Sequence, residues 1–192
     1  MTPRVVVGIS GASGAAIGVR VVERLVAMAV EVHLVVSHAA EATLRHEVGP
    51  DAAAHIQGLA AFAHDTAGIG DTIASGSFAT AGMIVAPCSM RTLAAIAHGL
   101  ADDLLIRAAD VHLKERRPLV LLARETPLHL GHLRNMVAAT ELGAIIAPPL
   151  PAFYRRPGSI AEMIDAIAAR TIDLLRLQVF PADAEWKGLP ES

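Results

Sequence analysis

The stretch VVVGISGASGAAIG, residues 5–18, decides the fold of this 192-residue chain. Its β-branched run predicts a buried strand, and the small residues that follow predict the start of a helix. Glycines recur where the chain passes from one to the other, at Gly8, Gly11, Gly14 and Gly18. This is typical of a strand–loop–helix unit that binds phosphate at a helix N-terminus. The spelling is neither G-x-G-x-x-G nor a loop that ends in G-K-[ST], so it fits neither common nucleotide-binding motif.

Apolar strand-like segments alternate with helix-like segments along the rest of the chain. The expected strands are residues 5–9, 32–36, 83–86, 119–123 and 144–147, the third ended by Pro87. The expected helices are residues 15–30, 39–48, 89–98, 102–116, 132–142 and 159–177. Residues 49–80 show only a weak pattern, and residues 178–192 are expected to form a polar C-terminal tail.

Short all-apolar strands that alternate with helices predict a parallel sheet covered on both faces. We therefore expect one α/β domain over residues 1–192, a Rossmann-like or flavodoxin-like three-layer sandwich. Ligands in such sheets bind outside the carboxyl ends of the strands. Polar residues stand at those ends in this chain, which predicts a mononucleotide- or dinucleotide-type site.

The composition excludes several classes of function. A net charge of −3, from 16 Lys and Arg against 19 Asp and Glu, gives no sign of a nucleic-acid surface. Charge, glycine or proline interrupts every apolar run, so no membrane span is expected. The hydrophobic content of 53% is high, which we interpret as subunit interface in a homo-oligomer. The single cysteine, Cys88, excludes an internal disulfide and fits a reducing cytoplasm.

Three strings together resemble one family, the UbiX-type flavin prenyltransferases. They are GISGASGA from residue 8, APCSMRTLAAIAHGLADDLLIRAADVHLKERRPLVLLARETPLHLGHL from residue 86 and PPLPAFYRRPGS from residue 148. The resemblance covers nearly the whole chain and is weakest across residues 49–71 and over the last few residues. It implies transfer of a dimethylallyl group from dimethylallyl phosphate to N5 and C6 of reduced FMN. It also implies a homo-oligomer, a dodecamer, and delivery of the prenylated FMN to a UbiD-type decarboxylase.

The resemblance also implies which residues contact FMN. They are Gly11, Ala12, Ser13, Ser37, Ser89, Met90, Arg91, Thr92 and Arg124. A simpler interpretation stands beside each serine, because a hydroxyl at these places can do no more than cap a helix. Family members vary at Arg91, so its backbone can matter more than its side chain. Ser37 stands where a dinucleotide-binding protein carries an acid for the ribose, which fits a mononucleotide.

The catalytic residues that the resemblance implies are Glu125, Lys114, Arg107, Ser13 and Glu47. Arg107 and Lys114 are seven residues apart, so they share a helix face, and the family gives them a phosphate-facing role. Glu125 matches a proton-handling carboxylate beside the flavin, although it could instead form a structural ion pair with Arg124 at a subunit contact. Glu47 matches an acid that reaches a neighbouring site, although by itself it would be an ordinary surface residue.

The substrate contacts that the resemblance implies are Tyr154, Arg170 and Trp186. A phenol and a guanidinium suit a phosphate monoester, and a tail tryptophan could shield an allyl cation. Without the resemblance, Tyr154 would anchor a loop through its hydroxyl, Arg170 would be a surface helix residue, and Trp186 would be a side chain that fills a packing gap. His129 and His132 form H-x-x-H without further ligands nearby, so no metal is expected.

Two other functions compete with prenyl transfer. One is an FMN-dependent decarboxylase, acting on cysteine-ended peptides or on aromatic acids. The cysteine-type enzymes carry a P-A-S-A-N-T-like string where this chain has PCSMRT from Pro87, and the missing Asn argues against them. Cys88 as a nucleophile is weakly supported, because no His is evident nearby. The other is a flavin carrier, which would have no need for Tyr154 and Arg170.

Overall fold

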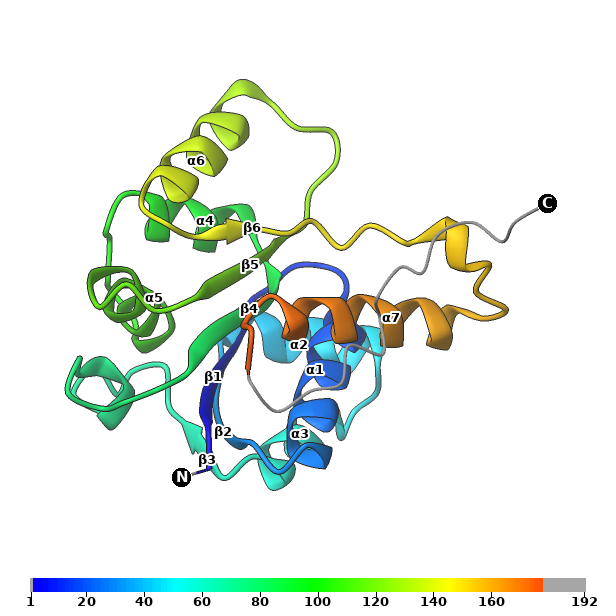
Figure 1. Ribbon diagram of the computed structural model, residues 1–192, viewed down its shortest axis with the longest axis horizontal. Helices are drawn as coiled ribbons and strands as arrows, with labels where there is room; N and C mark the ends of the chain where they lie inside the picture. The colour runs from blue at the N-terminus through cyan, green and yellow to red at the C-terminus, as the bar shows by residue number, and fades with distance from the viewer. Residues whose placement is uncertain (1, 178–192) are drawn as a thin grey trace.

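The computed structural model describes residues 2–177, and in this part of the chain six parallel strands form one sheet (Figure 1). Their order across the sheet is β3-β2-β1-β4-β5-β6. The strands are β1 (Arg4–Ile9), β2 (Glu31–Val36), β3 (Phe62–His64), β4 (Gly82–Cys88), β5 (Leu119–Ala123) and β6 (Ile145–Ile146). Every paired strand runs parallel to its neighbour, which confirms the predicted α/β class.

Helices cover both faces of the sheet. One face carries α1 (Ala15–Ala27), α2 (His38–Glu47), α3 (Ala52–Leu59) and α7 (Ile160–Asp173), whose apolar side chains share one core. The other carries α4 (Met90–Ala97), α5 (Leu104–Lys114) and α6 (Leu130–Glu141), which share a second core. Two short 3-10 helices complete the set, η1 (Thr72–Ala74) and η2 (Phe153–Arg155). Among the described helices, none has the length and apolarity to cross a membrane.

The opening strand shows why the segments are apolar throughout. Val5, Val7 and Ile9 of β1 point into the core beneath α1 and α7, and Val6 points into the opposite core. Side chains of a strand alternate between the two faces, so a strand with helices on both sides must be apolar at every position. β1 and its neighbour β4 therefore lie at the centre of the molecule.

Several boundaries differ from the prediction by a few residues, most clearly the ends of β4 and α7. β4 continues past Pro87 to Cys88, although the proline was expected to end it. The pairing between β4 and β5 shifts between Val85 and Cys88, so the missing N–H of the proline interrupts no regular ladder. At the C-terminal end, α7 stops at Asp173, before residue 177, and Arg176 follows with a φ of 51°.

Residues 49–80 contain structure that the sequence pattern did not predict, namely α3, β3 and η1. The edge strand β3 is three residues long and largely exposed, so it carries no apolar run. Polar contacts hold it instead. A ring nitrogen of His64 lies 2.9 Å from a ring nitrogen of His33 in β2, and the other ring nitrogen of His64 lies 2.7 Å from a carboxylate oxygen of Asp71. Such long-range contacts leave no periodic signal in the sequence.

Candidate functional site

The strand ends are joined at the carboxyl edge of the sheet by a buried serine. Ser10, directly after β1, donates its hydroxyl to Pro87 O at 3.0 Å and accepts from Ser89 N at 2.8 Å. Ser37 N donates to Ile9 O at 2.9 Å, which joins the end of β2 to the end of β1. Sequence reasoning missed Ser10, and its only signal was a hydroxyl placed directly after an apolar strand. These bonds bring the loops after β1, β2 and β4 into one place.

The glycine loop needs its glycines for close packing. A Cβ on Gly11 would lie 2.5 Å from the Ala39 Cβ, so a side chain there would push α2 away from the loop. A Cβ on Gly18 would lie 2.2 Å from the backbone oxygen of Ala86, so that glycine lets α1 pack directly on β4. Gly14, the N-cap of α1, has a φ of 106°, which favours glycine.

Glu47 at the end of α2 reaches this loop within its own chain. Its carboxylate accepts hydrogen bonds from Gly14 N at 2.8 Å and Ala15 N at 2.9 Å. Desolvation opposes ionisation of this carboxyl group, but hydrogen bonds from Ser13 and from the two amides outweigh it and lower the pKa of Glu47. The nearby positive charge of Arg124 acts in the same direction. Glu47 is thus held as an anion at the start of α1.

Two more helices begin at the same edge, each capped by a predicted flavin contact. Ser37 Oγ accepts from Ala40 N at 3.2 Å at the start of α2. Ser89 Oγ accepts from Thr92 N at 3.2 Å at the start of α4. The N-termini of α1, α2 and α4 therefore gather where an anion would be bound, because their partial positive charges add. A capping serine and a ligand-binding serine are compatible here, since the Ser37 hydroxyl still has a proton to donate.

The remaining residues of the PCSMRT string differ in what they face. Met90 is partly buried and Thr92 is buried. Arg91 is exposed, and its guanidinium lies 3.1 Å from a carboxylate oxygen of Asp102 and 3.5 Å from one of Asp103. Its side chain thus points toward the start of α5, which favours a backbone contribution at this position.

Arg124 and Glu125 follow β5 at the same edge of the sheet. Arg124 N donates to Cys88 O at 3.1 Å, and this bond keeps the arginine beside the end of β4. Glu125 accepts from Thr126 N at 2.9 Å. Both side chains are exposed, and in the described part of the chain they form no ion pair with each other. Their charges are available to a ligand.

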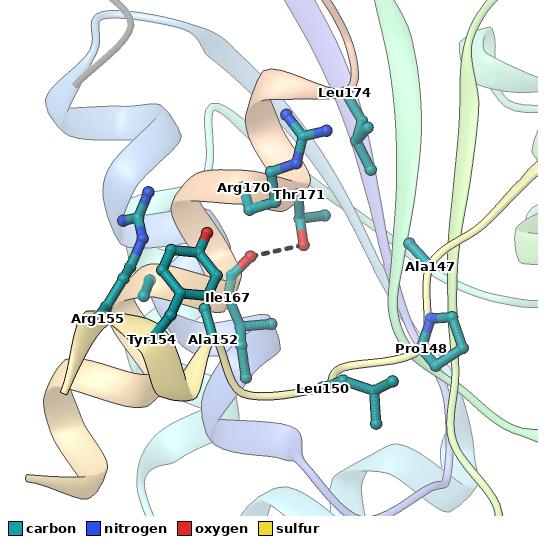
Figure 2. Close-up of a pocket in the computed structure, with 11 residues that line it drawn as sticks. Ala147, Pro148, Leu150, Ala152, Tyr154, Arg155, Ile167, Arg170, Thr171 and Leu174 are labelled. Carbon is teal, nitrogen blue, oxygen red and sulfur yellow. Dashed lines mark hydrogen bonds between the residues drawn. The ribbon is translucent and has the colours of Figure 1, made fainter. Parts of the chain in front are cut away.

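Tyr154 and Arg170 line one cavity of about 440 Å³ (Figure 2). It lies between the segment that follows β6 and the helix α7. Tyr154 belongs to η2 and is 62% exposed, and Arg170 belongs to the last turn of α7. Leu150, Ile167 and Leu174 give the same cavity an apolar wall. The structure therefore brings the two predicted substrate contacts together.

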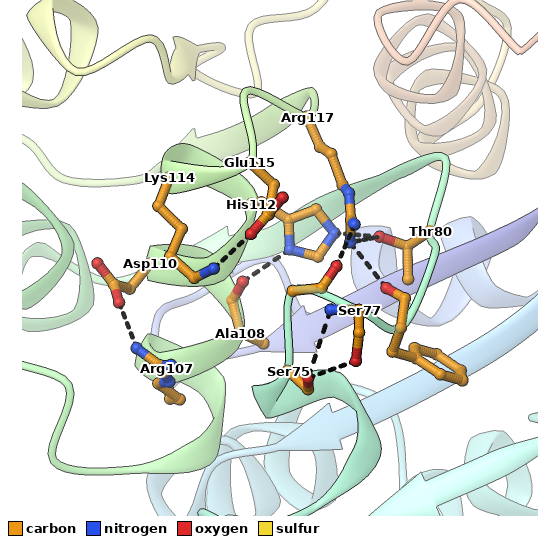
Figure 3. A network of polar contacts seen from close by, with 12 residues as sticks. Ser75, Ser77, Thr80, Arg107, Ala108, Asp110, His112, Lys114, Glu115 and Arg117 are labelled. Atoms are coloured by element: carbon orange, nitrogen blue, oxygen red, sulfur yellow. Dashed lines mark hydrogen bonds and ion pairs between the residues drawn. The ribbon is translucent and has the colours of Figure 1, made fainter.

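Arg107 and Lys114 lie apart from both groups. They belong to α5, where Arg107 pairs with Asp110 at 2.7 Å and Lys114 pairs with Glu115 (Figure 3). Lys114 ends the helix, and the chain then enters β5 at Leu119, so Lys114 lies at the amino edge of the sheet. The sheet also separates α5 from α7. One chain alone does not bring these cations to the Tyr154 cavity, and Trp186 lies outside the described residues.

Two sequence features carry no site of their own. Burial raises the pKa of the Cys88 thiol to about 12, so it is protonated at neutral pH and unsuited to act as a nucleophile. His129 and His132 stack with ring centroids 3.6 Å apart, and His129 Nδ1 caps α6 by accepting from Gly131 N. Residues 2–177 contain no group of three or more His, Cys, Asp or Glu that could hold a metal ion.

A parallel α/β sheet with three helix N-termini gathered at its carboxyl edge defines a nucleotide-binding protein, and the sequence matches the family described as Flavoprotein over residues 1–166. Flavin prenyltransferase UbiX of Neisseria meningitidis is 50% identical over 191 residues, which cover 100% of both chains. This chain belongs to the UbiX-type flavin prenyltransferases within that family.

Solved structures agree with this assignment. AnUbiX in complex with FMN and dimethylallyl pyrophosphate is 47% identical with a TM-score of 0.91, over 97% of this chain and 100% of that one. A dodecameric protein from Escherichia coli O157:H7, described as an FMN-dependent UbiX-like decarboxylase, is 45% identical with a TM-score of 0.90, over the same shares.

Proposed function

We propose that this protein joins the dimethylallyl group of dimethylallyl phosphate to reduced FMN, with release of phosphate. Reduced FMN supplies the nucleophilic N5, and the product is linked at N5 and C6. The observation that carries the proposal is that the chain has two regions of different construction whose donors suit a phosphate group. The glycine loop offers fixed backbone donors, and the Tyr154 cavity offers side-chain donors beside an apolar wall. A nucleotide phosphate and an allylic phosphate need one region each.

FMN fits the first region. Ala12 N donates to Ser10 O at 2.8 Å, and the Glu47 carboxylate accepts hydrogen bonds from the amides of Gly14 and Ala15. Gly11 N and Ser13 N donate to no acceptor in the described residues, so they are left for a ligand. With the Ser37 hydroxyl they would hold one phosphate at the N-termini of α1 and α2.

The flavin ring would then extend along the carboxyl edge. The start of α4, with Ser89, Met90 and Thr92, would line it from one side. Arg124 would lie beside it, and its charge would favour the electron-rich reduced flavin. Because the Arg91 side chain is directed at Asp102 and Asp103, only its backbone would take part.

The allylic substrate fits the second region. Tyr154 and Arg170 would bind its phosphate, since a guanidinium and a phenol match a phosphate monoester in charge and geometry. Leu150, Ile167 and Leu174 would contact the five-carbon chain. A cavity of about 440 Å³ has room for such a substrate. Trp186 of the tail is proposed to cover the reacting carbons.

We propose that assembly completes the site. Lys114 and Arg107 would neutralise the leaving phosphate, but α5 lies across the sheet from α7, so a neighbouring subunit would have to supply them. The apolar face of α6 supports a large subunit contact: Leu130, Leu133 and Val137 are spaced as one helix face and are 58, 46 and 58% exposed. A dodecamer like that of the Escherichia coli relative would meet this need.

Proton handling is assigned to Glu125 and to the released phosphate. Glu125 is an exposed carboxylate beside the flavin region and would accept the proton lost when C6 is substituted. Ser13 hydrogen-bonds the Glu47 carboxylate, so the Ser13 hydroxyl has a fixed orientation beside the loop. The positive charges of Lys114, Arg107, Arg124 and Arg170 would supply the electrostatic part of catalysis.

The product would serve a partner decarboxylase of the UbiD type, and a cytoplasmic location fits the free thiol of Cys88. Decarboxylation through that thiol is disfavoured, because its raised pKa keeps it protonated. A flavin carrier would not need the Tyr154 cavity.

One anaerobic experiment separates these functions. The purified protein is mixed with reduced FMN and dimethylallyl phosphate, and the mass of the released flavin is measured. Prenyl transfer predicts a flavin heavier by one five-carbon unit. Unmodified FMN that stays tightly bound would contradict the proposal and leave the carrier and the decarboxylase to be tested, the latter with cysteine-ended peptides and aromatic acids.

A further inference from the structure

The side chains of Lys114 and Glu115 pair in a way that a helix alone does not favour. Lys114 is the last residue of α5 and Glu115 is its C-cap, and the two form an ion pair. Consecutive side chains on a helix diverge, so partners normally stand three or four residues apart. An acid at a helix C-terminus also meets the negative end of the helix dipole. The loop before β4 packs against this pair.

Gly76, in the loop before β4, lies directly beside the ends of this pair. A Cβ on Gly76 would lie 2.1 Å from Glu115 Oε1 and 2.6 Å from Lys114 Nζ, both far below contact distance. The backbone of Gly76 is outside the left-handed region, so conformation does not require a glycine. A side chain at this position would instead displace the ends of Lys114 and Glu115, which pack directly over the Gly76 backbone.

Arg117 holds this loop against the end of α5 (Figure 3). Its guanidinium donates to Gly76 O at 2.6 Å and to Phe78 O at 2.8 Å. Both acceptors are backbone atoms, so the contacts fix the path of the chain rather than one side chain. Ser75 and Ser77 add a hydroxyl contact of 2.9 Å across Gly76. The loop is a fixed surface for Lys114.

His112 provides the second anchor. Burial lowers its pKa to about 4, so the ring is neutral at pH 7. Its Nδ1 donates to Ala108 O at 2.7 Å, because a carbonyl can only accept. Nε2 must then accept from the Thr80 hydroxyl at 2.8 Å, which joins the far end of the loop to α5.

We propose that Gly76 and Glu115 are positioning residues that set where Lys114 Nζ lies. The inference rests on the proposed function of Lys114, which is to contact the phosphate of the allylic substrate in a neighbouring subunit. Glu115 directs the ammonium group through their ion pair, and Gly76 admits it to that position. Misplacing such a group by about 1 Å can cost about 100-fold in rate, so the position has a measurable consequence.

The test is the substitution Gly76→Ala, with Gly70→Ala as a matched control. A Cβ on Gly70 would meet nothing within 4 Å, and Gly70 lies in a nearby turn of the same connection. Single-turnover prenyl transfer should fall about tenfold or more in Gly76→Ala and stay unchanged in Gly70→Ala. FMN affinity should be unchanged in both, because the glycine loop is not disturbed.

Combination with Lys114→Ala separates positioning from a general structural role. If Gly76 acts through Lys114, Gly76→Ala has no further effect on single-turnover rates in the Lys114→Ala background. The same tenfold loss in both backgrounds, or wild-type rates in Gly76→Ala, would overturn the inference. Wild-type rates in Lys114→Ala would instead overturn the role proposed for Lys114, and this inference with it.

Glu115→Gln provides a second variant if Gly76→Ala does not fold. It keeps the size of the side chain and removes its charge, so Lys114 loses its ionic partner. We expect a several-fold lower single-turnover rate, which again disappears in the Lys114→Ala background. An unchanged rate in Glu115→Gln would show that Glu115 does not position Lys114.

Discussion

The glycine loop and the Tyr154 cavity would both bind phosphate, but they are built from different parts of the chain. The loop presents backbone amides at helix N-termini, and its geometry is fixed by close packing of Gly11 and by Glu47. The cavity presents the ends of long side chains on η2 and α7, and Tyr154 is largely exposed. A rigid site suits the FMN phosphate, which would stay bound while the prenyl group is transferred. An adjustable site suits a phosphate that must leave.

The largest expected effect is on the cavity. Arg170→Ala should lower prenyl transfer about 100-fold to 1,000-fold, because it removes a donor that would stabilise the leaving phosphate. FMN affinity, measured by fluorescence titration, should not change. Arg170→Lys keeps the positive charge but loses the planar guanidinium, so its rate of prenyl transfer should lie between those of the wild type and Arg170→Ala. A parallel loss of FMN affinity in Arg170→Ala would show that the two regions are not separate.

The second effect is on the loop. Gly11→Ala places a Cβ 2.5 Å from the Ala39 Cβ, so α2 must move away from the amides of the loop. We expect FMN affinity to fall about tenfold or more, since the donors lose their geometry. Gly58→Ala, where a Cβ meets nothing within 4 Å, is the control. Equal affinities in the two variants would contradict the role of close packing.

The third effect concerns Glu47 and pH. Its folded-state pKa is depressed below the ordinary 4.5, so it contributes stability above that value and loses the contribution as pH falls through the folded pKa. In Glu47→Gln, the part of the pH dependence of the unfolding free energy that comes from Glu47 should be missing. Because Glu47 is exposed, we expect a difference below about 1 kcal/mol at pH 7. Denaturant unfolding between pH 3 and pH 7, at roughly unit steps, would measure it, and identical curves would contradict the assignment.

The smallest effect is expected for Arg91→Ala. Its ion pairs with Asp102 and Asp103 are exposed, so stability should change by less than about 0.5 kcal/mol. FMN affinity should also stay within about twofold, since the Arg91 side chain is directed at Asp102 and Asp103. A large loss of affinity would mean that the side chain turns toward the flavin.

The sequence predicted the central strands and their helices because those elements have strong local signals. β5 matches its expected range of 119–123, and α4 and α5 begin within two residues of their expected starts, after the capping residues Ser89 and Asp103. The region around β3 was missed because its stability depends on His33, His64 and Asp71, which meet only in the folded chain. Alternation cannot reveal a strand of three residues.

The site was predictable in part. The polar residues at the carboxyl ends of the strands indicated where it would lie, and the family resemblance joined Tyr154 to Arg170. The contact of Glu47 with the loop amides could not be read from spacing, because α2 must first fold back along the loop. The place of Lys114 at the opposite edge of the sheet also required the fold, since the helix face that it shares with Arg107 does not say which site it serves.

The most direct test of the central claim is complementation between Lys114→Ala and Arg170→Ala. The sheet separates these residues within one chain, so a working site should take them from different chains. Subunits of the two variants would be co-expressed and their mixed oligomers assayed for prenyl transfer. Random mixing predicts about a quarter of wild-type activity, since half of the chains supply each intact residue. Mixed oligomers no more active than the separate variants would show that both residues act from the same chain, and would contradict the account.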